Sequence, residues 1–429
     1  MTADIALRPH VLGALRSQVN AFGQVLGRPV LRRVLPAMLL SAIGDGMSVV
    51  AVAWLAVRIA PADQVGIWTA LAVAAYALPA TVGAAVLARL VRGLPATVLV
   101  TLDAALRAVA LGTIAALAIA GALTPGLYVI LLAGSSLLHA WGNAGAYTLI
   151  AELVPDDDQV HGNALLSTFT QASYVVGPAL AGGLTAWAGP GWVIAVDAAS
   201  WVVLAATCYS APRSPVPPIP PEGRLATSGS RAILGNRRLA GLLAVTCLFF
   251  FLYGPVEVAL PVHIAQEISG SAALLGAFWA TFGVGAIVGG LGAGLLRNQP
   301  LWTVVAVIII GWGAALLPLG LTDSVLPGLI GFALGGLIYG PFIAICTALF
   351  QRSSPPHLLS RVLATRTALT TPSTALGTLL GGPLVAAVGG RHTLLASALL
   401  TIALGIAVAV ASWPAGRKMT VRPSRHRRR

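Results

Sequence analysis

The sequence has few charged residues and few reactive ones. Only 9% of its 429 residues are Asp, Glu, Lys or Arg, whereas 57% are hydrophobic. A soluble domain carries about 25% charge, so this chain has too few ions to cover a surface that faces water. The three cysteines all lie in apolar stretches and show neither a disulfide framework nor metal-ligand spacing. The composition therefore predicts a polytopic membrane protein, and we expect no bound metal and no cofactor.

The motifs of common enzyme chemistry are also absent from the sequence. It contains no HExxH pair, no hydrolase nucleophile motif and no P-loop of the form GxxxxGK[ST]. We therefore expect that the chain is not an enzyme and does not hydrolyse ATP. Glycine, in contrast, is abundant, with 48 residues. Small residues let membrane helices approach closely, so this composition favours a packed helical bundle.

Long apolar runs divide the chain at regular intervals. Each run has roughly 20 to 25 residues, enough to cross ~30 Å of hydrocarbon as a helix. The runs predict an all-α membrane protein with 12 transmembrane helices, near residues 34–57, 65–87, 96–119, 126–150, 163–187, 191–210, 239–262, 272–296, 301–321, 326–350, 362–388 and 393–411.

Arginine is unevenly distributed over the predicted loops. It gathers before the first run, after the second, sixth, eighth and tenth, and in the tail, while the intervening loops hold only Arg58 and Arg391. Positive loops face the cytoplasm. We therefore expect a multi-pass protein of the bacterial cytoplasmic membrane with both termini inside. The basic tail is interpreted as a patch that sets topology and touches membrane lipid, and no nucleic-acid partner is expected.

The stretch 211–231 is rich in Pro, Ser and Gly and predicts a non-helical segment, within a cytoplasmic Pro/Arg-rich linker at 211–238. It separates six apolar runs from six. The predicted organisation is an interfacial segment at 1–33, a six-helix bundle at 34–210, the linker, a second six-helix bundle at 239–411 and a basic tail at 412–429.

The two predicted bundles repeat a glycine pattern. Three glycines of the first half recur 200 residues later in the second: Gly177, Gly182 and Gly189 as Gly377, Gly382 and Gly389. A repeat of six plus six helices is the architecture of a two-bundle transporter, whose site lies near the membrane midplane.

The twelve runs, the polar linker and the repeat together resemble the major facilitator superfamily. LSAIGDGMSVVAVAWLAV at 40–57 and AELVPDDDQVHGNAL at 151–165 are similar to its macrolide-efflux branch of proton–drug antiporters. The resemblance implies secondary export of a hydrophobic or amphipathic small molecule, such as a drug, an antibiotic or another natural product, in exchange for protons by alternating access. We expect a monomer. The alternatives are an uptake symporter or a lipid or siderophore transporter on the same fold, and, more remotely, a membrane receptor or a membrane-embedded enzyme.

GPALAGG at 177–183 is similar to the fifth-helix antiporter motif of this family, although it is one residue longer. Gly177 and Pro178 can bend a helix, and Gly182 and Gly183 allow a neighbouring helix to approach. The resemblance therefore implies an antiporter-type fifth helix, with generic packing of small residues as the alternative.

The loop after the second run departs from the family pattern, because Ala88 replaces the usual acid before Arg89. Asp103 and Arg107 are spaced i and i+4 and can form a replacement pair. We expect this pair, with Arg89 and Arg92, to form the cytoplasmic gate; solvated loop charge is the alternative for the two loop arginines.

Few ionisable residues lie within the apolar runs. Asp45 lies near the middle of the first run, His139 near mid-depth of the fourth and Glu257 in the seventh. A charge there is costly unless it is paired or used, and desolvation favours the protonated carboxyl. These three residues are the proton-coupling candidates; hydrogen-bonded structural roles, or for Glu257 a hydrated position, are the alternatives. Asp197 is interpreted as a helix-packing acceptor.

Candidates for an amphipathic substrate cavity are Trp54, Asn143, Tyr174 and Tyr253. Alignment of the two halves places Asp45 close to Tyr253, one turn before Glu257. The resemblance implies that the two acids face one cavity.

Overall fold

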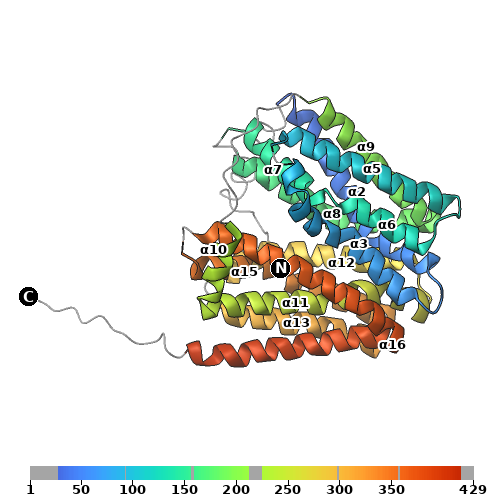
Figure 1. The fold of residues 1–429 in the computed structure, drawn as a ribbon. Helices are drawn as coiled ribbons and strands as arrows, with labels where there is room; N and C mark the ends of the chain where they lie inside the picture. The colour runs from blue at the N-terminus through green and yellow to red at the C-terminus, as the bar shows by residue number, and fades with distance from the viewer. Residues whose placement is uncertain are drawn as a thin grey trace, which may run out of the picture. The chain divides into compact units, whose positions relative to one another are not determined.

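The computed structural model describes residues 28–91, 93–155, 159–211, 225–296, 299–355 and 358–416. In these ranges the regular structure is helical throughout (Figure 1). In chain order the first half contains α2 (Leu31–Ile59), α3 (Val65–Val86), α4 (Ala88–Val91), α5 (Ala96–Ile119), α6 (Pro125–Ser136), α7 (His139–Leu153), α8 (Gln159–Ala188) and α9 (Pro190–Tyr209). The second half contains α10 (Leu225–Leu234), α11 (Arg237–Val262), the π-helical turn η3 (His263–Glu267), α12 (Ala272–Leu291), η4 (Gly292–Leu296), α13 (Leu301–Leu321), α14 (Val325–Tyr339), α15 (Phe342–Ser353) and α16 (Leu359–Gly416).

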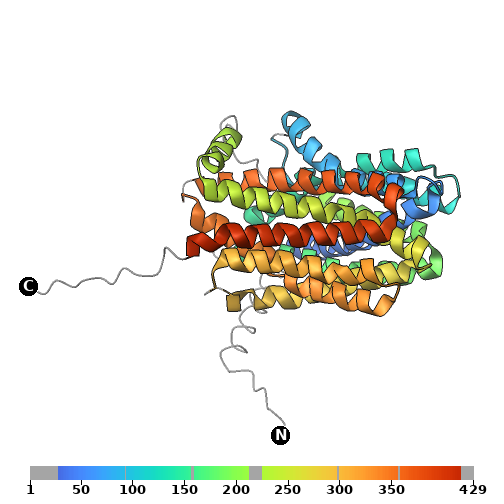
Figure 2. The ribbon, with the colours of Figure 1, turned by 90° about the horizontal axis from the view of Figure 1, so that it is seen from below.

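Ten helical segments among the described residues are long and apolar enough to cross a membrane. One of them, Arg361–Ala411, is much longer than a single span needs. Gly389 interrupts it with φ 83° and ψ 168°, and the helix folds back there into two arms (Figure 2). The 30-residue helix α8 is not among the ten. The all-helical membrane fold is confirmed, whereas the count of twelve spans stays a prediction.

The helices form two compact units. Unit 1 comprises Met1–Ile59 and Ala75–Pro220, and unit 2 comprises Ala60–Ala74 and Pro221–Arg429. Residues 60–74, which the sequence places in the first bundle, thus group with unit 2. In unit 1, α9 packs against both α2 and α5, and in unit 2, α16 packs against α11 and α13 (Figure 1).

The linker differs from the prediction in one part. Residues Leu225–Leu234 form α10, although the stretch 211–231 was expected to be non-helical. The last proline of the stretch is Pro221, so no ring clash interrupts a helix beyond it. Residues 212–224, with the N-terminal segment before residue 28 and the tail after 416, lie outside the described residues.

The repeat is visible in the backbone of each unit. Gly189 has φ 91° and ψ 164°, and Gly389 adopts nearly the same left-handed conformation. In unit 1 the backbone of Gly46 in α2 lies against Gly177 of α8; in unit 2 Gly254 of α11 lies against Gly377 of α16. A side chain at any of these four contact positions would collide with backbone, so glycine is required for the helices to approach this closely.

The fourth predicted span of each bundle is a broken helix. In unit 1 the break separates α6 from α7 at residues 137–138, directly before His139. In unit 2 it separates α14 from α15 at residues 340–341. Discontinuous membrane helices expose backbone groups that a continuous helix would bond internally, and they accompany binding sites in transporters.

Candidate functional site: a charged cluster inside unit 1

Five helices of unit 1 each contribute an ionisable or phenolic side chain to one buried cluster. The contributors are Asp45 on α2, Tyr76 on α3, Arg107 on α5, His139 on α7 and Asp197 on α9. Arg107 lies eleven residues after Ala96, the first residue of α5, or about 16 Å along the helix. The cluster therefore lies deep in the apolar part of the bundle, where ionisable residues are rare and mark functional sites.

Arg107 forms an ion pair with Asp45. Its Nη1 lies 2.5 Å from Oδ1 of the carboxylate. The hydroxyl of Tyr76 donates to the same Oδ1 at 2.6 Å and accepts from Nη1 at 3.3 Å. Three helices thus meet at one carboxylate oxygen. The pairing compensates the charge of Asp45 within the bundle, whereas a lone carboxylate in hydrocarbon would have no such compensation.

The guanidinium of Arg107 is also held by aromatic faces. Its Cζ lies 4.7 Å from the ring centre of Trp201 and 5.3 Å from that of Tyr76. A planar cation is attracted to the electron-rich face of such rings, most strongly where water is excluded. The side chain can therefore keep its charge although it is almost completely buried.

Asp103 and His139 continue the cluster on the other side of Arg107. Nε of Arg107 lies 3.8 Å from Oδ1 of Asp103, and Nδ1 of His139 lies 3.5 Å from Oδ2. The other ring nitrogen of His139 lies 3.4 Å from the side-chain amide nitrogen of Asn143. Asp103 and Arg107 do come together as their spacing predicts, but the close partner of Arg107 is Asp45, 62 residues away.

Asp197 is fully buried next to this network. The hydroxyl of Ser48 donates to its Oδ2. Trp201 follows one turn later on α9 and interacts with the carboxylate, although neither its indole nitrogen nor Oδ1 of Asp197 has an ordinary hydrogen-bond geometry within the described chain. No cation of the described residues lies within ion-pair distance of Asp197. Its interpretation as a packing acceptor is compatible with this environment.

Glycines make room for the buried carboxylates. A Cβ on Gly44 would collide with the carboxylate of Asp197, and a Cβ on Gly142 would collide with that of Asp103. The glycines that flank Asp45 in the sequence thus admit neighbouring helices: Gly44 faces α9, and Gly46 faces Ser173 and Gly177 of α8.

Unit 2 places Glu257 in a different setting. The hydroxyl of Thr378 on α16 donates to its Oε2 at 3.0 Å, and the described residues provide no ion-pair partner for it. The ring of Trp312 lies near those of Tyr253, Phe282 and Tyr339, with centroid distances of 5.9, 5.4 and 6.1 Å. An aromatic cluster therefore occupies the interior of unit 2.

The substrate-cavity candidates lie in unlike surroundings. Trp54 is buried in α2, Tyr253 belongs to the aromatic cluster, and Asn143 and Tyr174 are exposed. Three of them, Trp54, Asn143 and Tyr174, belong to unit 1 and Tyr253 to unit 2. Their assignment to a substrate cavity stays a prediction.

The antiporter-type residues lie on α8, which is helical through Pro178. Gly177 is the position where α8 touches α2, whereas a Cβ on Gly183 would meet open space. Gly182 is buried. A close approach to α2 therefore occurs at Gly177, the first glycine of the motif.

The three expected gate residues that the structure describes do not gather in one place. Arg89 is exposed on the short helix α4, and Arg92 lies outside the described residues. Asp103 and Arg107 are buried in the interior of α5. The buried pair belongs to the charged cluster, because its side chains point toward α2 and α7 at mid-helix.

Tyr76 is the member of the cluster that the sequence reasoning missed. It is the one tyrosine in α3 and carries no motif. The signal that could have found it is the part-buried carboxylate of Asp45, which needs donors from neighbouring helices.

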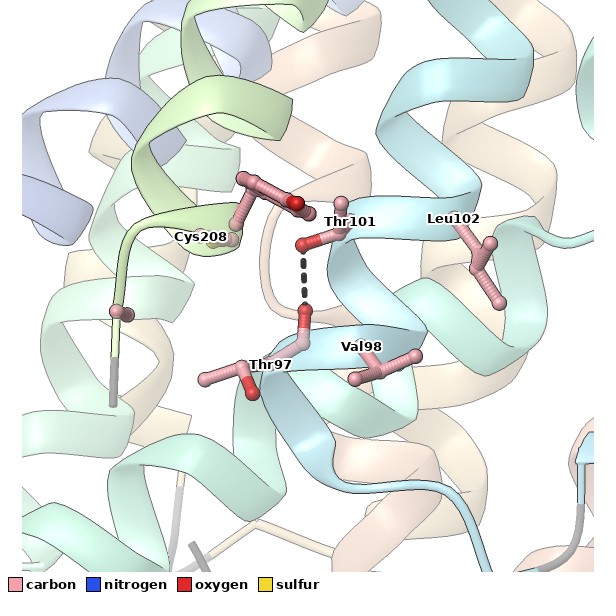
Figure 3. A pocket seen from close by; sticks show the side chains of 7 residues that line it. Thr97, Val98, Thr101, Leu102 and Cys208 are labelled. Atoms are coloured by element: carbon pink, nitrogen blue, oxygen red, sulfur yellow. Dashed lines mark hydrogen bonds between the residues drawn. The ribbon is translucent and has the colours of Figure 1, made fainter. Parts of the chain in front are cut away.

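A small pocket lies apart from the cluster at one end of α5 and α9 (Figure 3). Thr97, Thr101, Leu102 and Cys208 are among its lining residues. The hydroxyl of Thr101 donates to the carbonyl oxygen of Thr97, whereas Oγ1 of Thr97 has no hydrogen-bond partner within the described chain. None of the predicted site residues lines this pocket.

Buried ionisable groups within a bundle of membrane-type helices, together with an internal repeat and broken helices, define the class of secondary transporters. The chain belongs to the Major Facilitator Superfamily, whose family model matches residues 34–371. The family match confirms the resemblance that the sequence showed.

Individual relatives extend the comparison. The chain is 28% identical over 411 residues to the multidrug efflux pump Tap of Mycobacterium bovis, covering 91% of this chain and 94% of the relative. It is 26% identical over 267 residues to macrolide efflux protein A of Streptococcus pyogenes, covering 59% of this chain and 65% of the relative, just under two thirds of its length. The crystal structure of the nucleoside transporter NupG matches with a TM-score of 0.70 at 14% identity, covering 89% of this chain and 99% of that one. Such a low identity shows the shared fold alone.

Proposed function

We propose that the protein exports hydrophobic or amphipathic small molecules across the bacterial cytoplasmic membrane in exchange for protons. The family membership supports transport, and two observations support export: the match to a multidrug efflux pump over 91% of the chain and the match to a macrolide efflux protein. The proposed orientation, with both termini in the cytoplasm, is supported by the arginine-rich loops. We also propose that the protein works as a monomer.

The ion pair of Asp45 and Arg107 carries the proposal of proton coupling. Asp45 is the carboxylate that joins α2, α3 and α5, and 27% of its side chain is exposed. It can therefore exchange a proton while its partner Arg107 stays buried. A change of charge at this point alters the balance of the whole cluster, because a buried cation without its partner is expensive. Glu257 is a second candidate, supported by its position inside α11.

Transport in everted membrane vesicles tests this function. Vesicles that contain the protein should accumulate radiolabelled erythromycin, or ethidium, when their lumen is acidified. Asp45→Asn should lower this accumulation by about tenfold or more, since the loss of the charge removes the coupling group and the partner of Arg107. Asp63→Asn, at an exposed carboxylate that contacts only the side chain of Gln64 in the described structure, is the matched control and should behave as wild type.

Correct folding of the variants is checked by size-exclusion chromatography in detergent, with Asp45→Glu as the conservative variant that retains the charge. Normal accumulation by a folded Asp45→Asn protein would assign a structural role to Asp45. Gradient-driven accumulation in right-side-out vesicles, with none in everted ones, would contradict export and favour uptake.

A further inference from the structure

Four ionisable groups form a continuous line through unit 1. The line runs from Asp45 on α2 through Arg107 and Asp103 on α5 to His139 on α7, with successive nitrogen–oxygen distances of 2.5, 3.8 and 3.5 Å. Both ends are partly exposed, since 27% of the side chain of Asp45 and 27% of that of His139 is accessible. The two middle groups are nearly inaccessible, at 2% for Arg107 and 4% for Asp103.

The buried middle of the line contains unsatisfied polar atoms that face one another. Nε of Arg107, Oδ1 of Asp103 and Nδ1 of His139 each lack a hydrogen-bond partner within the described chain. Their separations of 3.8 and 3.5 Å slightly exceed a hydrogen bond. Buried donors and acceptors that remain unpaired are costly. A second arrangement, in which Arg107 bonds to Asp103, therefore lies within a small movement of the guanidinium.

Charge balance links the two arrangements to protonation. When Arg107 neutralises Asp45, the charge of Asp103 is balanced if His139 carries a proton. When Asp45 is protonated, Arg107 is free to neutralise Asp103, and a neutral His139 suffices. Each state then holds one exchangeable proton, on His139 in the first and on Asp45 in the second.

We propose that Asp103 is a positioning residue that receives Arg107 when Asp45 is protonated, so that the line Asp45–Arg107–Asp103–His139 carries one exchangeable proton at either end. The proton that binds Asp45 comes from water at that end, and His139 releases one to water at its own end, so the total is conserved. Two further groups interact with the line. The hydroxyl of Tyr76 forms hydrogen bonds with Asp45 and Arg107, and the carboxylate of Asp197, which accepts a hydrogen bond from Ser48, interacts electrostatically with Arg107.

The packing around the line is suited to such an exchange. Gly142 leaves space directly against the carboxylate of Asp103, and the break between α6 and α7 precedes His139. The ring of Trp201 lies under the guanidinium of Arg107. It also meets the imidazole of His139 edge-on, with 6.4 Å between the two ring centroids. An aromatic face can support a cation in either position, because this attraction does not depend on a single hydrogen-bond direction.

The inference rests on the proposed proton coupling, and its first test needs neither substrate nor transport. The full-length protein is labelled with nitrogen-15 at arginine, reconstituted in lipid nanodiscs and studied by NMR. The Nε–H resonance of Arg107 is assigned as the one that is missing in Arg107→Lys. Asp45→Asn, which mimics protonated Asp45, should move this resonance because Nε then bonds to Asp103. The shift should vanish in Asp45→Asn/Asp103→Asn. Asp63→Asn, at an exposed carboxylate in the other unit, is the control and should leave the resonance unchanged.

An Arg107 resonance that is the same in wild type and Asp45→Asn would overturn the partner exchange, as would a shift that persists without Asp103. The second test uses erythromycin in proteoliposomes: Asp103→Asn should abolish accumulation driven by a pH gradient but retain equilibrium exchange of the labelled compound. Equal loss of both would assign Asp103 a merely structural role. Failure of the wild type to transport erythromycin or ethidium would count against the proposed function and leave the resonance test to decide the exchange.

Discussion

Unit 1 and unit 2 place opposite kinds of side chain at matching points of a repeated helical arrangement. Glycine contacts give the match: Gly83 of α3 lies against the carbonyl of Leu137, and Gly289 of α12 lies against that of Leu337. The contacts of Gly46 and Gly254 match in the same way, as do the turns at Gly189 and Gly389. Four positions of unit 1 therefore have counterparts in unit 2. Asp45, Tyr76, His139 and Asp197 correspond to Tyr253, Phe282, Tyr339 and Ser397.

The interior of each unit is completed by a residue from the third helix of its bundle. In unit 1 Arg107 contacts both Asp45 and Tyr76; in unit 2 Trp312 contacts both Tyr253 and Phe282. One interior is held by charge and hydrogen bonds, the other by ring packing. In both units, therefore, the close glycine contacts specify the helix arrangement, whereas the side chains in the interior differ. The cluster around Arg107 contains carboxylates and an imidazole that can bind protons, whereas the described rings around Trp312 contain neither group.

The largest effect is expected when Arg107 is replaced by Met. The change leaves the part-buried carboxylate of Asp45 and the buried carboxylate of Asp103 without this cation and should lower the free energy of unfolding by about 3–5 kcal/mol. Thermal unfolding in detergent measures it. Adding Asp45→Asn should restore part of the loss, because it removes the unpaired charge, and Arg58→Met, at an exposed site, should change stability by no more than about 0.5 kcal/mol.

Trp312→Ala in unit 2 sharpens the contrast, since it should cost a similar ~3–5 kcal/mol through a cavity. Tyr253→Phe should not rescue it, because no charge is left unpaired there. If Asp45→Asn gave no rescue of Arg107→Met, the ion pair would not be what stabilises the interior of unit 1.

A smaller effect is expected for Gly142→Ala. The added methyl collides with the carboxylate of Asp103 and should destabilise unit 1 by about 1–3 kcal/mol, while weakening gradient-driven transport. Gly134→Ala is the matched control on α6, where a Cβ meets nothing within 4 Å. The control should be neutral or slightly stabilising, since alanine is the better helix former. Equal behaviour of the two variants would refute the contact between Gly142 and Asp103.

The smallest effect is expected for Ser48→Ala, measured by the same unfolding assay. It removes the donor to Oδ2 of the fully buried Asp197 and should cost about 1–2 kcal/mol. Ser397→Ala, at the position that matches Asp197, removes only a bond to the carbonyl of Leu252 and should cost about 1 kcal/mol or less. A larger loss for Ser397→Ala than for Ser48→Ala would reverse the expected contrast between the units.

The fold class was predictable because membrane spans have a simple physical signature: long apolar runs with few charges. The sequence also predicted that Asp45 has a special role, since a lone acid in such a run is costly. It could not identify the partner. Local spacing pointed to Asp103 for Arg107, whereas the structure places Asp45 closest, from a different helix. The helical segment at 225–234 was missed because the prolines of the adjoining stretch dominated the composition.

Each apolar run buries its surface in lipid and bonds its own backbone as a helix, independently of the other runs. The sequence alone was therefore sufficient to predict the helical membrane fold, the repeat and the family. Tertiary structure alone decided which polar groups meet. The rotation of each helix depends on glycine contacts between helices, such as Gly44 with Asp197 and Gly142 with Asp103, and these are non-local. Those rotations bring Asp45, Arg107, Asp103 and His139 into one line, because buried charges are stable only beside partners that other helices supply.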